Sequence, residues 1–269
     1  MLKERDIPGA EGAARPRQSV QSVERTLDLM EALANAQGEI SITNLAQRTG
    51  LHVSTVHRLL ATLVHRGYVR QNRETARYYL GAKLALLGEG APRYTELRLQ
   101  SQSALAALTD LIDETTNLVV LEDTAAVYID QVQCKQVVRL FTAIGNRVPL
   151  QCTAAGKVLL AWLPAEQRER IVDRLEFRSY TPRSIASRSA LAAAIEQVRK
   201  NGYALDEEEY QAGVRCIAVP IVTADGHAVA SISVSAPAHR LPRARALEIF
   251  PAMRRAAMAI ASGLAAARR

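Results

Sequence analysis

The spacing of hydrophobic residues predicts two helices at the start of the ordered part of the chain. Apolar side chains recur every three or four positions over residues 20–33, which indicates an amphipathic helix that Gly38 ends. The residues of this apolar face are Val20, Val23, Leu27, Met30 and Leu33. A short second helix follows, with Thr43 as its expected N-cap and Gly50 at its end.

A third helix and two short strands complete this N-terminal pattern. The helix opens at Ser54, and residues 68–71 and 76–80 then flank a turn at 72–75, as in a β-hairpin. The predicted buried face of the helix consists of Val56, Leu59, Leu60, Leu63 and Val64. Helix, short helix, glycine-containing turn, helix and hairpin is the order of a winged helix-turn-helix, which we predict over residues 19–81.

The rest of the chain predicts an α+β domain on an antiparallel sheet. Residues 1–18 lack apolar periodicity and indicate a flexible tail, residues 82–95 a linker helix, and residues 96–269 the second domain. Strands are expected at 117–121, 125–131, 137–141, 218–222 and 228–235, and helices at 95–114, 153–163, 189–200 and 245–269.

Composition excludes several classes of protein. Charged residues make up 23% of the 269 positions, and hydrophobic residues 48%, which is ordinary globular usage and argues against wholesale disorder. No charge-free apolar run is long enough to cross a membrane, and the first residues lack the apolar core of a signal peptide, so we expect a cytoplasmic protein. The three cysteines are widely spaced without metal-ligand partners, so we expect no metal and no cofactor.

The positive charge is concentrated in two segments. The whole chain carries a net charge of +7, yet residues 41–81 alone hold six arginines against Glu74, a net charge of +5. Residues 240–269 hold seven arginines against Glu248, a net charge of +6. The first segment coincides with the predicted helix-turn-helix and indicates a polyanion-binding surface. The second is open to two interpretations, a solvated terminal helix or an interface.

Polar side chains at the start of the third helix and in the hairpin are the candidate DNA contacts. Recognition helices contact base edges and phosphates with their N-terminal residues, and arginine pairs bidentately with guanine. The hairpin would reach the backbone or the minor groove. The candidates are Thr43, Ser54, Thr55, His57, Arg58, Arg70, Arg73 and Arg77. The alternative is a protein-interaction module with an exposed polar helix.

Several segments together resemble the IclR family of bacterial transcriptional regulators. The stretches QSVERTLDLMEAL and ITNLAQRTGLHVSTVHRLLATLVHRGYV are similar to the family's winged helix-turn-helix. The stretches RLFTAIGNRVPLQCTAAGKVLLAWLP and GYALDEEEYQAGVRCIAVPIVTADGHAVASISVSAP are similar to its GAF-like effector-binding domain. The resemblance implies a homodimer or homotetramer that binds a double-stranded DNA operator and a small-molecule effector, as a repressor or as an activator.

The second domain contains a candidate anion site. Thr153, Ala154, Ala155 and Gly156 precede an apolar helix, where backbone N–H groups and the helix dipole attract a carboxylate or a phosphate. The resemblance places the carboxylate of an organic or aromatic acid at Ala154 and Ala155, although many relatives have glycine where Ala154 stands. The other effector-binding positions implied by the resemblance are Leu140, Val148, Asp206, Val214, Cys216, Ser233 and Ser235. The two serines alternate along one strand and face the same side.

Other interpretations of these residues stay open. The alternative for Asp206 is a turn or cap residue, and the alternative for Cys216 is a buried small side chain. The acidic run 206–209 is more typical of a solvated helix start or turn, with only Asp206 facing inward, than of a metal site, and Lys157 is expected to be a surface charge. An enzyme using Cys216 as a nucleophile would need an oriented base, yet His227 and His239 lie in turn-like segments.

Overall fold

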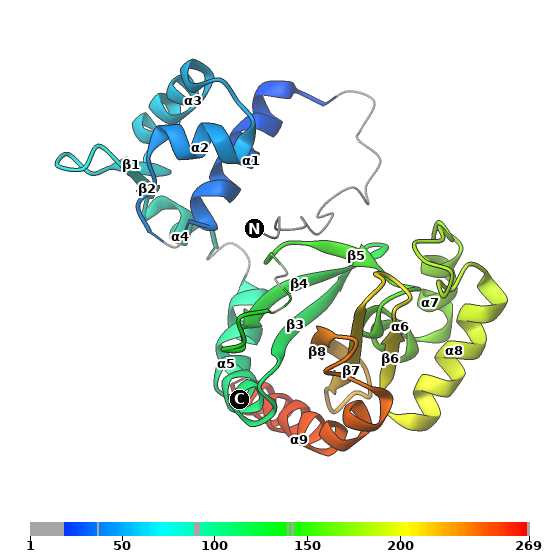
Figure 1. Ribbon diagram of the computed structural model, residues 1–269. Coiled ribbons are helices and arrows are strands. Elements are labelled where there is room, and N and C mark those ends of the chain that lie inside the picture. Colours follow the sequence, from blue (N-terminus) through cyan, green and yellow to red (C-terminus); the bar gives the residue numbers. More distant parts are fainter. Residues whose placement is uncertain (1–18, 37, 89–91, 139, 141–142, 268–269) are drawn as a thin grey trace. The chain divides into compact units, whose positions relative to one another are not determined.

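The chain divides into two compact units that part between residues 95 and 96 (Figure 1). The computed structural model describes residues 19–36, 38–88, 92–138, 140 and 143–267, so the predicted tail lies outside the described residues. None of the helices in these ranges is both long and apolar enough to cross a membrane.

The N-terminal unit is a winged helix-turn-helix. Its elements are α1 (Gln21–Ala34), α2 (Ile42–Thr49), α3 (Val53–His65), β1 (Val69–Gln71), β2 (Tyr78–Leu80) and α4 (Lys83–Gly88). The N-cap of α2 is Ser41, whose hydroxyl accepts a hydrogen bond from Asn44 N at 3.3 Å. The prediction of Thr43 as the cap is therefore wrong: Ser41 precedes it and places Thr43 in the first turn. Helix α3 likewise begins one residue before Ser54.

The core of this unit is formed by α1, α2 and α3 around the hairpin. Helix α3 buries Val56, Leu60 and Leu63, as predicted, while Leu59 and Val64 pack at the edge of the cluster. Helix α1 departs from the prediction. It buries Leu29 and Leu33 and leaves an apolar stripe exposed, because its sequence carries apolar residues on two sides and periodicity does not tell which side faces the core. The exposed stripe consists of Val20, Val23 and Leu27.

The C-terminal unit is built on a six-stranded antiparallel sheet in the order β5-β4-β3-β8-β7-β6 (Figure 1). The strands are β3 (Thr115–Glu122), β4 (Ala125–Val132), β5 (Arg147–Pro149), β6 (Ala204–Glu207), β7 (Val214–Val222) and β8 (Ala228–Pro237). The helices are α5 (Pro92–Ile112), α6 (Ala154–Ala161), α7 (Ala165–Val172), α8 (Arg188–Asn201) and α9 (Arg243–Ala267). The α+β prediction is confirmed.

One predicted strand of this unit is wrong, and two strands were not predicted. The strand expected at 137–141 is absent at Val137 and Val138, which lie in bends with side chains 94% and 66% exposed. Arg139 and Phe141 lie outside the described residues. A β-branched run this exposed has no neighbouring strand to pair with, whereas β5 and β6, which the sequence did not predict, pair with β4 and β7.

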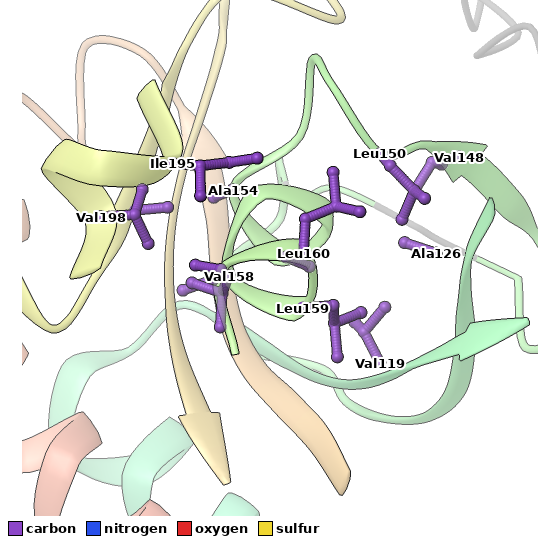
Figure 2. Packing of buried hydrophobic residues seen from close by; sticks show 14 of the residues in the cluster. Val119, Ala126, Val148, Leu150, Ala154, Val158, Leu159, Leu160, Ile195 and Val198 are labelled. Atoms are coloured by element: carbon purple, nitrogen blue, oxygen red, sulfur yellow. The ribbon is translucent and has the colours of Figure 1, made fainter. Parts of the chain in front are cut away.

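Helix α6 is the centre of the core on one face of the sheet (Figure 2). All eight of its residues are buried, because the sheet lies on one side and α8 on the other. Ile195 and Val198 of α8 pack against it, as do Val119 of β3 and Val148 of β5. Gly156 permits the close packing, since a Cβ there would stand 2.4 Å from the backbone oxygen of Leu150.

Helices α5 and α9 cover the opposite face of the sheet. Thr109 of α5 bonds Thr116 of β3 through their hydroxyl oxygens, which lie 2.6 Å apart. The last turn of α5 turns one side toward the sheet. Ile112 is buried, and Leu111 is 65% exposed.

Candidate DNA-binding and effector-binding sites

The start of α3 presents the polar side chains predicted to contact DNA. Ser54, His57 and Arg58 are exposed and Thr55 is half-buried. Gly50 ends α2 in the left-handed conformation, with φ +66°, which allows the tight turn into α3. The apolar positions of α3 anchor it to the core, so its solvent face is left for recognition.

The wing carries three exposed arginines. Arg70 lies on β1 opposite Tyr79 of β2, Arg73 lies in the turn, and Arg77 precedes β2. Thr43, on α2, is also exposed. These side chains belong to the same unit as α3, and together they form a basic surface suited to phosphate contacts.

Glu39 fixes the turn of the wing, a role that the sequence did not predict. Its carboxylate accepts hydrogen bonds from Asn72 Nδ2 at 2.7 Å and Thr75 Oγ1 at 2.8 Å. The same two hydrogen bonds, Asn72 first, lower the pKa of Glu39 below its usual value. The neighbouring Ile40 pairs with Tyr78 through both backbone hydrogen bonds and so adds a third short segment to the hairpin.

One face of the six-stranded sheet gathers the polar residues predicted for the effector site. Directly opposed residues in antiparallel strands point to the same face. Asp206 of β6 lies opposite Cys216 of β7, which lies opposite Ser235 of β8. Ser233, two residues along β8, faces the same side. That side is the one covered by α6, because Ala218, two residues from Cys216, belongs to the core cluster around α6.

Helix α6 begins at this cluster with unbonded backbone donors. The Thr153 hydroxyl caps the helix by accepting from Gly156 N at 3.2 Å. Ala154 and Ala155 are the first helical residues, so their N–H groups have no intrahelical acceptor and lie at the positive end of the helix dipole. Both side chains pack in the cluster that Cys216 borders. The arrangement suits a small anion.

Lys157 and Glu209 form a buried ion pair within this site. Lys157 Nζ lies 2.5 Å from Glu209 Oε1, and the two side chains are 5% and 13% exposed. The prediction of Lys157 as a surface charge is wrong, because α6 is enclosed on every side and has no solvent face. The prediction of a solvated helix start or turn at 206–209 is also wrong, since Asp206 and Glu207 lie on strand β6. Nor is Asp206 the one inward-facing residue of this run, because Glu209 faces inward too.

Burial changes the titration of the two predicted polar residues beside this pair. Asp206 is 3% exposed, and burial, followed by the charge of Glu209, raises its pKa to about 7. Asp206 Oδ1 accepts a hydrogen bond from Glu209 N at 2.7 Å. Burial also raises the pKa of the Cys216 thiol, and Asp206 raises it further. Cys216 therefore stays a protonated thiol and donates to Ser235 Oγ at 3.2 Å.

The remaining predicted effector residues are apolar, and of these Val148 belongs to the core cluster around α6. Val148 is buried on β5 opposite Ala126 of β4, Val214 is half-buried at the start of β7, and Leu140 is half-buried between β4 and β5. Two surface hollows of the unit, of about 350 and 550 Å³, are lined by other residues. Asp206, Ser233 and Ser235 are buried, so the polar part of the predicted site is closed, whereas Cys216 and Val214 are half-buried.

The chain matches family models in both units. Residues 22–73 match the IclR helix-turn-helix domain, and residues 92–262 match the bacterial transcriptional regulator IclR C-terminal domain. The chain belongs to the IclR family. It is 35% identical to the HTH-type transcriptional regulator XynR of Escherichia coli, over 91% of this chain and 97% of XynR.

Two further relatives agree with this assignment. The transcriptional repressor IclR of E. coli is 37% identical over 87% of this chain and 86% of that protein. The crystal structure of Thermotoga maritima IclR aligns with a TM-score of 0.72 and 27% identity, and covers 91% of this chain and 98% of that one. The relatives are regulators of transcription.

The geometry around Cys216 of this IclR-family chain is the reverse of what a nucleophile requires. A catalytic cysteine needs a lowered pKa and a nearby base. The pKa of Cys216 is raised, its hydrogen-bond partner is Ser235, and His227 instead lies 3.4 Å from the Trp162 carbonyl oxygen. Across the described ranges, no three His, Cys, Asp or Glu side chains are grouped as a metal site.

Several polar residues of the site were not predicted from the sequence. Asn117 of β3 lies opposite Ser233, Gln131 of β4 lies opposite Asn117, and Tyr128 of β4 is close enough for Cys216 and Asp206 to raise its pKa, with burial the largest cause. One signal was available for Asn117. Asn117 opens the otherwise apolar run 117–121, and a polar side chain in such a strand is expected to form hydrogen bonds inside the core. The structure buries it fully.

Proposed function

We propose that this protein is a ligand-controlled repressor whose residues 19–81 bind an operator and whose residues 96–269 bind a small organic acid. The observation that carries the proposal is the convergence of Asp206, Cys216, Ser233 and Ser235 on one sheet face beside the first N–H groups of α6. The similarity to the repressor IclR supports repression over activation.

In the DNA complex, α3 enters the major groove and the wing lies on the backbone. Arg58 pairs with a base, and Ser54, Thr55 and His57 contact base edges or phosphates. The remaining contacts, to phosphates, come from Thr43, Arg70, Arg73 and Arg77. The exposure of these side chains and the rigid anchoring of the wing by Glu39 support this assignment.

In the effector complex, the carboxylate of the acid accepts hydrogen bonds from the N–H groups of Ala154 and Ala155. Ser233 and Ser235 donate to polar atoms of the same molecule, and Asp206 and Cys216 border it. Apolar contacts come from Leu140, Val148 and Val214. Pyruvate, gluconate and benzoate represent the three classes of acid that fit such a site: short, sugar-derived and aromatic.

Effector binding is coupled to DNA binding through the closure of the site. Ser233 is 2% exposed and Ser235 4%, so an acid reaches them only after the packing between α6 and the sheet opens. A ligand that binds the opened arrangement more tightly shifts the population toward it. A coupling of 1–3 kcal/mol between the two sites corresponds to a change in operator affinity of roughly 5- to 150-fold.

The exposed apolar stripe of α1 supports a homodimer. Val20, Val23 and Leu27 are 63%, 54% and 52% exposed and lie along one side of the helix. A second copy of the chain would cover such a stripe, and a dimer suits operators with two half-sites.

The test is a titration of fluorescently labelled promoter DNA from beside this gene with the full chain, alone and with each of the three acids. At least one acid should change the dissociation constant fivefold or more. Ser233→Ala should abolish that response and leave the affinity for DNA without acid unchanged. Tight binding of DNA that none of the acids alters would overturn the effector half of the proposal.

A further inference from the structure

A row of hydrogen-bonding side chains crosses the centre of the sheet on the face covered by α6. Cys216, Ser235, Asn117 and Gln131 come from four neighbouring strands, β7, β8, β3 and β4. Asn117 lies opposite both Ser233 and Gln131, so it links the serines to the far side of the sheet. It is fully buried and has no contact with solvent.

The hydrogen bonds of this row run in one direction. Gln131 Nε2 donates to Asn117 Oδ1 at 2.9 Å, and Gln131 Oε1 accepts from Gln133 Nε2 at 3.3 Å. Asn117 Nδ2 then donates to Ser233 Oγ and Ser235 Oγ, each at 3.4 Å. The same nitrogen lies 3.5 Å from the Ser233 carbonyl oxygen, which can only accept. The amide nitrogen, not the amide oxygen, therefore faces the serines.

This direction determines where the serine protons point. Ser235 Oγ accepts from Asn117 Nδ2 and from Cys216 Sγ, so both of its lone pairs are used. Ser233 Oγ accepts from Asn117 as well. Within the described ranges neither serine hydroxyl donates to a protein acceptor. Their protons are thus directed away from Asn117, toward the α6 side of the sheet.

We propose that Asn117, held by Gln131, is a specificity-determining residue that fixes the hydroxyls of Ser233 and Ser235 as donors and so selects a carboxylate over its neutral amide. The proposal rests on the proposed function, since it names how the effector site distinguishes ligands. A carboxylate offers only acceptors, whereas a primary amide brings an NH₂ group for which the two fixed O–H donors and the two backbone N–H donors offer no acceptor. Among the polar residues that border the effector, Asp206 and Cys216 are then left to accept from it, at the cost of two unmatched donors.

The orientation of the hydroxyls can be tested without any effector. Neutron diffraction from crystals of the full chain exchanged into D₂O locates the deuterium atoms of side chains. The amide deuterons of Asn117 should point at the two serine oxygens, and both hydroxyl deuterons should point away from Asn117. Hydroxyl deuterons directed at Asn117 Oδ1 would overturn the proposal even if an acid proves to regulate the protein.

The consequence for binding is tested by calorimetry with pyruvate, gluconate and benzoate and their neutral primary amides. Asn117→Leu should weaken binding of the acid at least tenfold and reduce its preference over the amide. In the Ser233→Ala/Ser235→Ala background, the same change should alter acid affinity less than twofold, because Asn117 acts through those hydroxyls. An undiminished effect in that background, or an unchanged acid-to-amide ratio in Asn117→Leu, would contradict it.

A matched control separates this role from stability alone. Thr116 is the neighbour of Asn117 on β3, is equally buried, and faces α5, where its hydroxyl bonds Thr109 and the Leu105 carbonyl oxygen. Thr116→Val should lower the stability of the unit and leave the acid-to-amide ratio unchanged. If none of the three acids binds the natural chain, the effector half of the proposed function fails, and the neutron result alone decides the role of Asn117.

Discussion

The two units of this chain place their polar groups in opposite environments. In the N-terminal unit Arg58, Arg70 and Arg73 project into solvent from a conventional apolar core. In the C-terminal unit Lys157 and Asp206 are buried beside hydrophobic residues. Exposed charges act through a field on a large polyanion, so their number matters most. Buried groups act through individual hydrogen bonds, so their positions matter most and each unpaired one is costly.

The basic segment 240–269 differs from both groups, because several of its arginines lie near the surface but are paired with carboxylates. Arg240 forms two hydrogen bonds with the Glu114 carboxylate, at 2.6 and 2.9 Å. Arg243 pairs with Glu207, and Arg245 with Glu248 on the same helix. These three of the seven arginines in residues 240–269 are paired within their own unit, so the net charge of the segment overstates the positive charge that is free to attract DNA.

The largest effect is expected from removing the buried cation. Lys157→Met leaves the Glu209 carboxylate buried without its partner, which should lower the free energy of unfolding by about 3–5 kcal/mol. Urea unfolding followed by the fluorescence of Trp162, the single tryptophan of the chain, reports on this unit. Adding Glu209→Gln to Lys157→Met should recover part of the loss.

Arg170→Met is the matched control. Arg170 pairs with Glu166 on α7, but the two side chains are 71% and 84% exposed. Solvent screening makes such a pair contribute little, so its loss should not measurably change stability. Equal destabilisation by the two variants would show that burial does not distinguish the ion pairs.

The contrast between exposed and buried polar groups also explains which features could be predicted from the sequence. The helix-turn-helix, its basic charge and the alternation that places Ser233 and Ser235 on one face follow from local spacing, and the structure agrees. Local spacing could not choose between the two apolar sides of α1, nor show that α6 is enclosed by the sheet and α8, which lie far from it in the chain. The errors at Val20 and Lys157 follow from that missing information.

Local patterns also could not identify hydrogen-bond and ion-pair partners that are far apart in the sequence. Asn117 and Ser233 are separated by 116 positions, and Lys157 and Glu209 by 52. Glu39 and Thr75, in the N-terminal unit, are 36 positions apart. A side chain that is polar within an apolar strand signals a buried contact, but only the strand order identifies the partner.

The titration of Asp206 provides the second prediction. Its pKa is about 7 in the folded chain and near 4 in the unfolded chain, so between these pH values the folded state holds a proton that the unfolded state has lost. The stability of the natural chain should therefore fall relative to Asp206→Asn as pH rises, by up to ~1.4 kcal/mol per unit. From pH 5 to pH 8 the relative loss should reach roughly 2–3 kcal/mol in urea unfolding.

An exposed carboxyl group serves as the control for that experiment. Hydrogen bonds from Thr223 and then His227 lower the pKa of Asp225, so it is ionised in both states throughout pH 5–8. The stability difference between the natural chain and Asp225→Asn should stay constant over that range. A parallel slope for both variants would contradict the assignment of the titration to Asp206.

The exposed surface is tested next by separating base contacts from phosphate contacts. Arg58→Ala should cost about 1–3 kcal/mol of binding to the promoter fragment and much less on unrelated DNA, because it removes the proposed base contact. Arg77→Ala should weaken binding to both DNAs about equally and reduce the slope of log K against log salt by about 1. Anisotropy titrations at several salt concentrations measure both. Equal losses on both DNAs for Arg58→Ala would make it a backbone contact.

The smallest effect is expected at Glu39, whose side chain acts both through an exposed charge and through individual hydrogen bonds. Its negative charge opposes the phosphates, while its hydrogen bonds to Asn72 and Thr75 hold the wing that presents the arginines. Glu39→Gln removes the charge and keeps a hydrogen-bonding side chain of the same shape, so DNA affinity should rise slightly. Glu39→Ala removes both, and should bind roughly threefold more weakly than Glu39→Gln at equal salt, since each exposed hydrogen bond contributes little. If the two variants bind equally, charge alone governs this surface and the anchoring of the wing has no part in recognition.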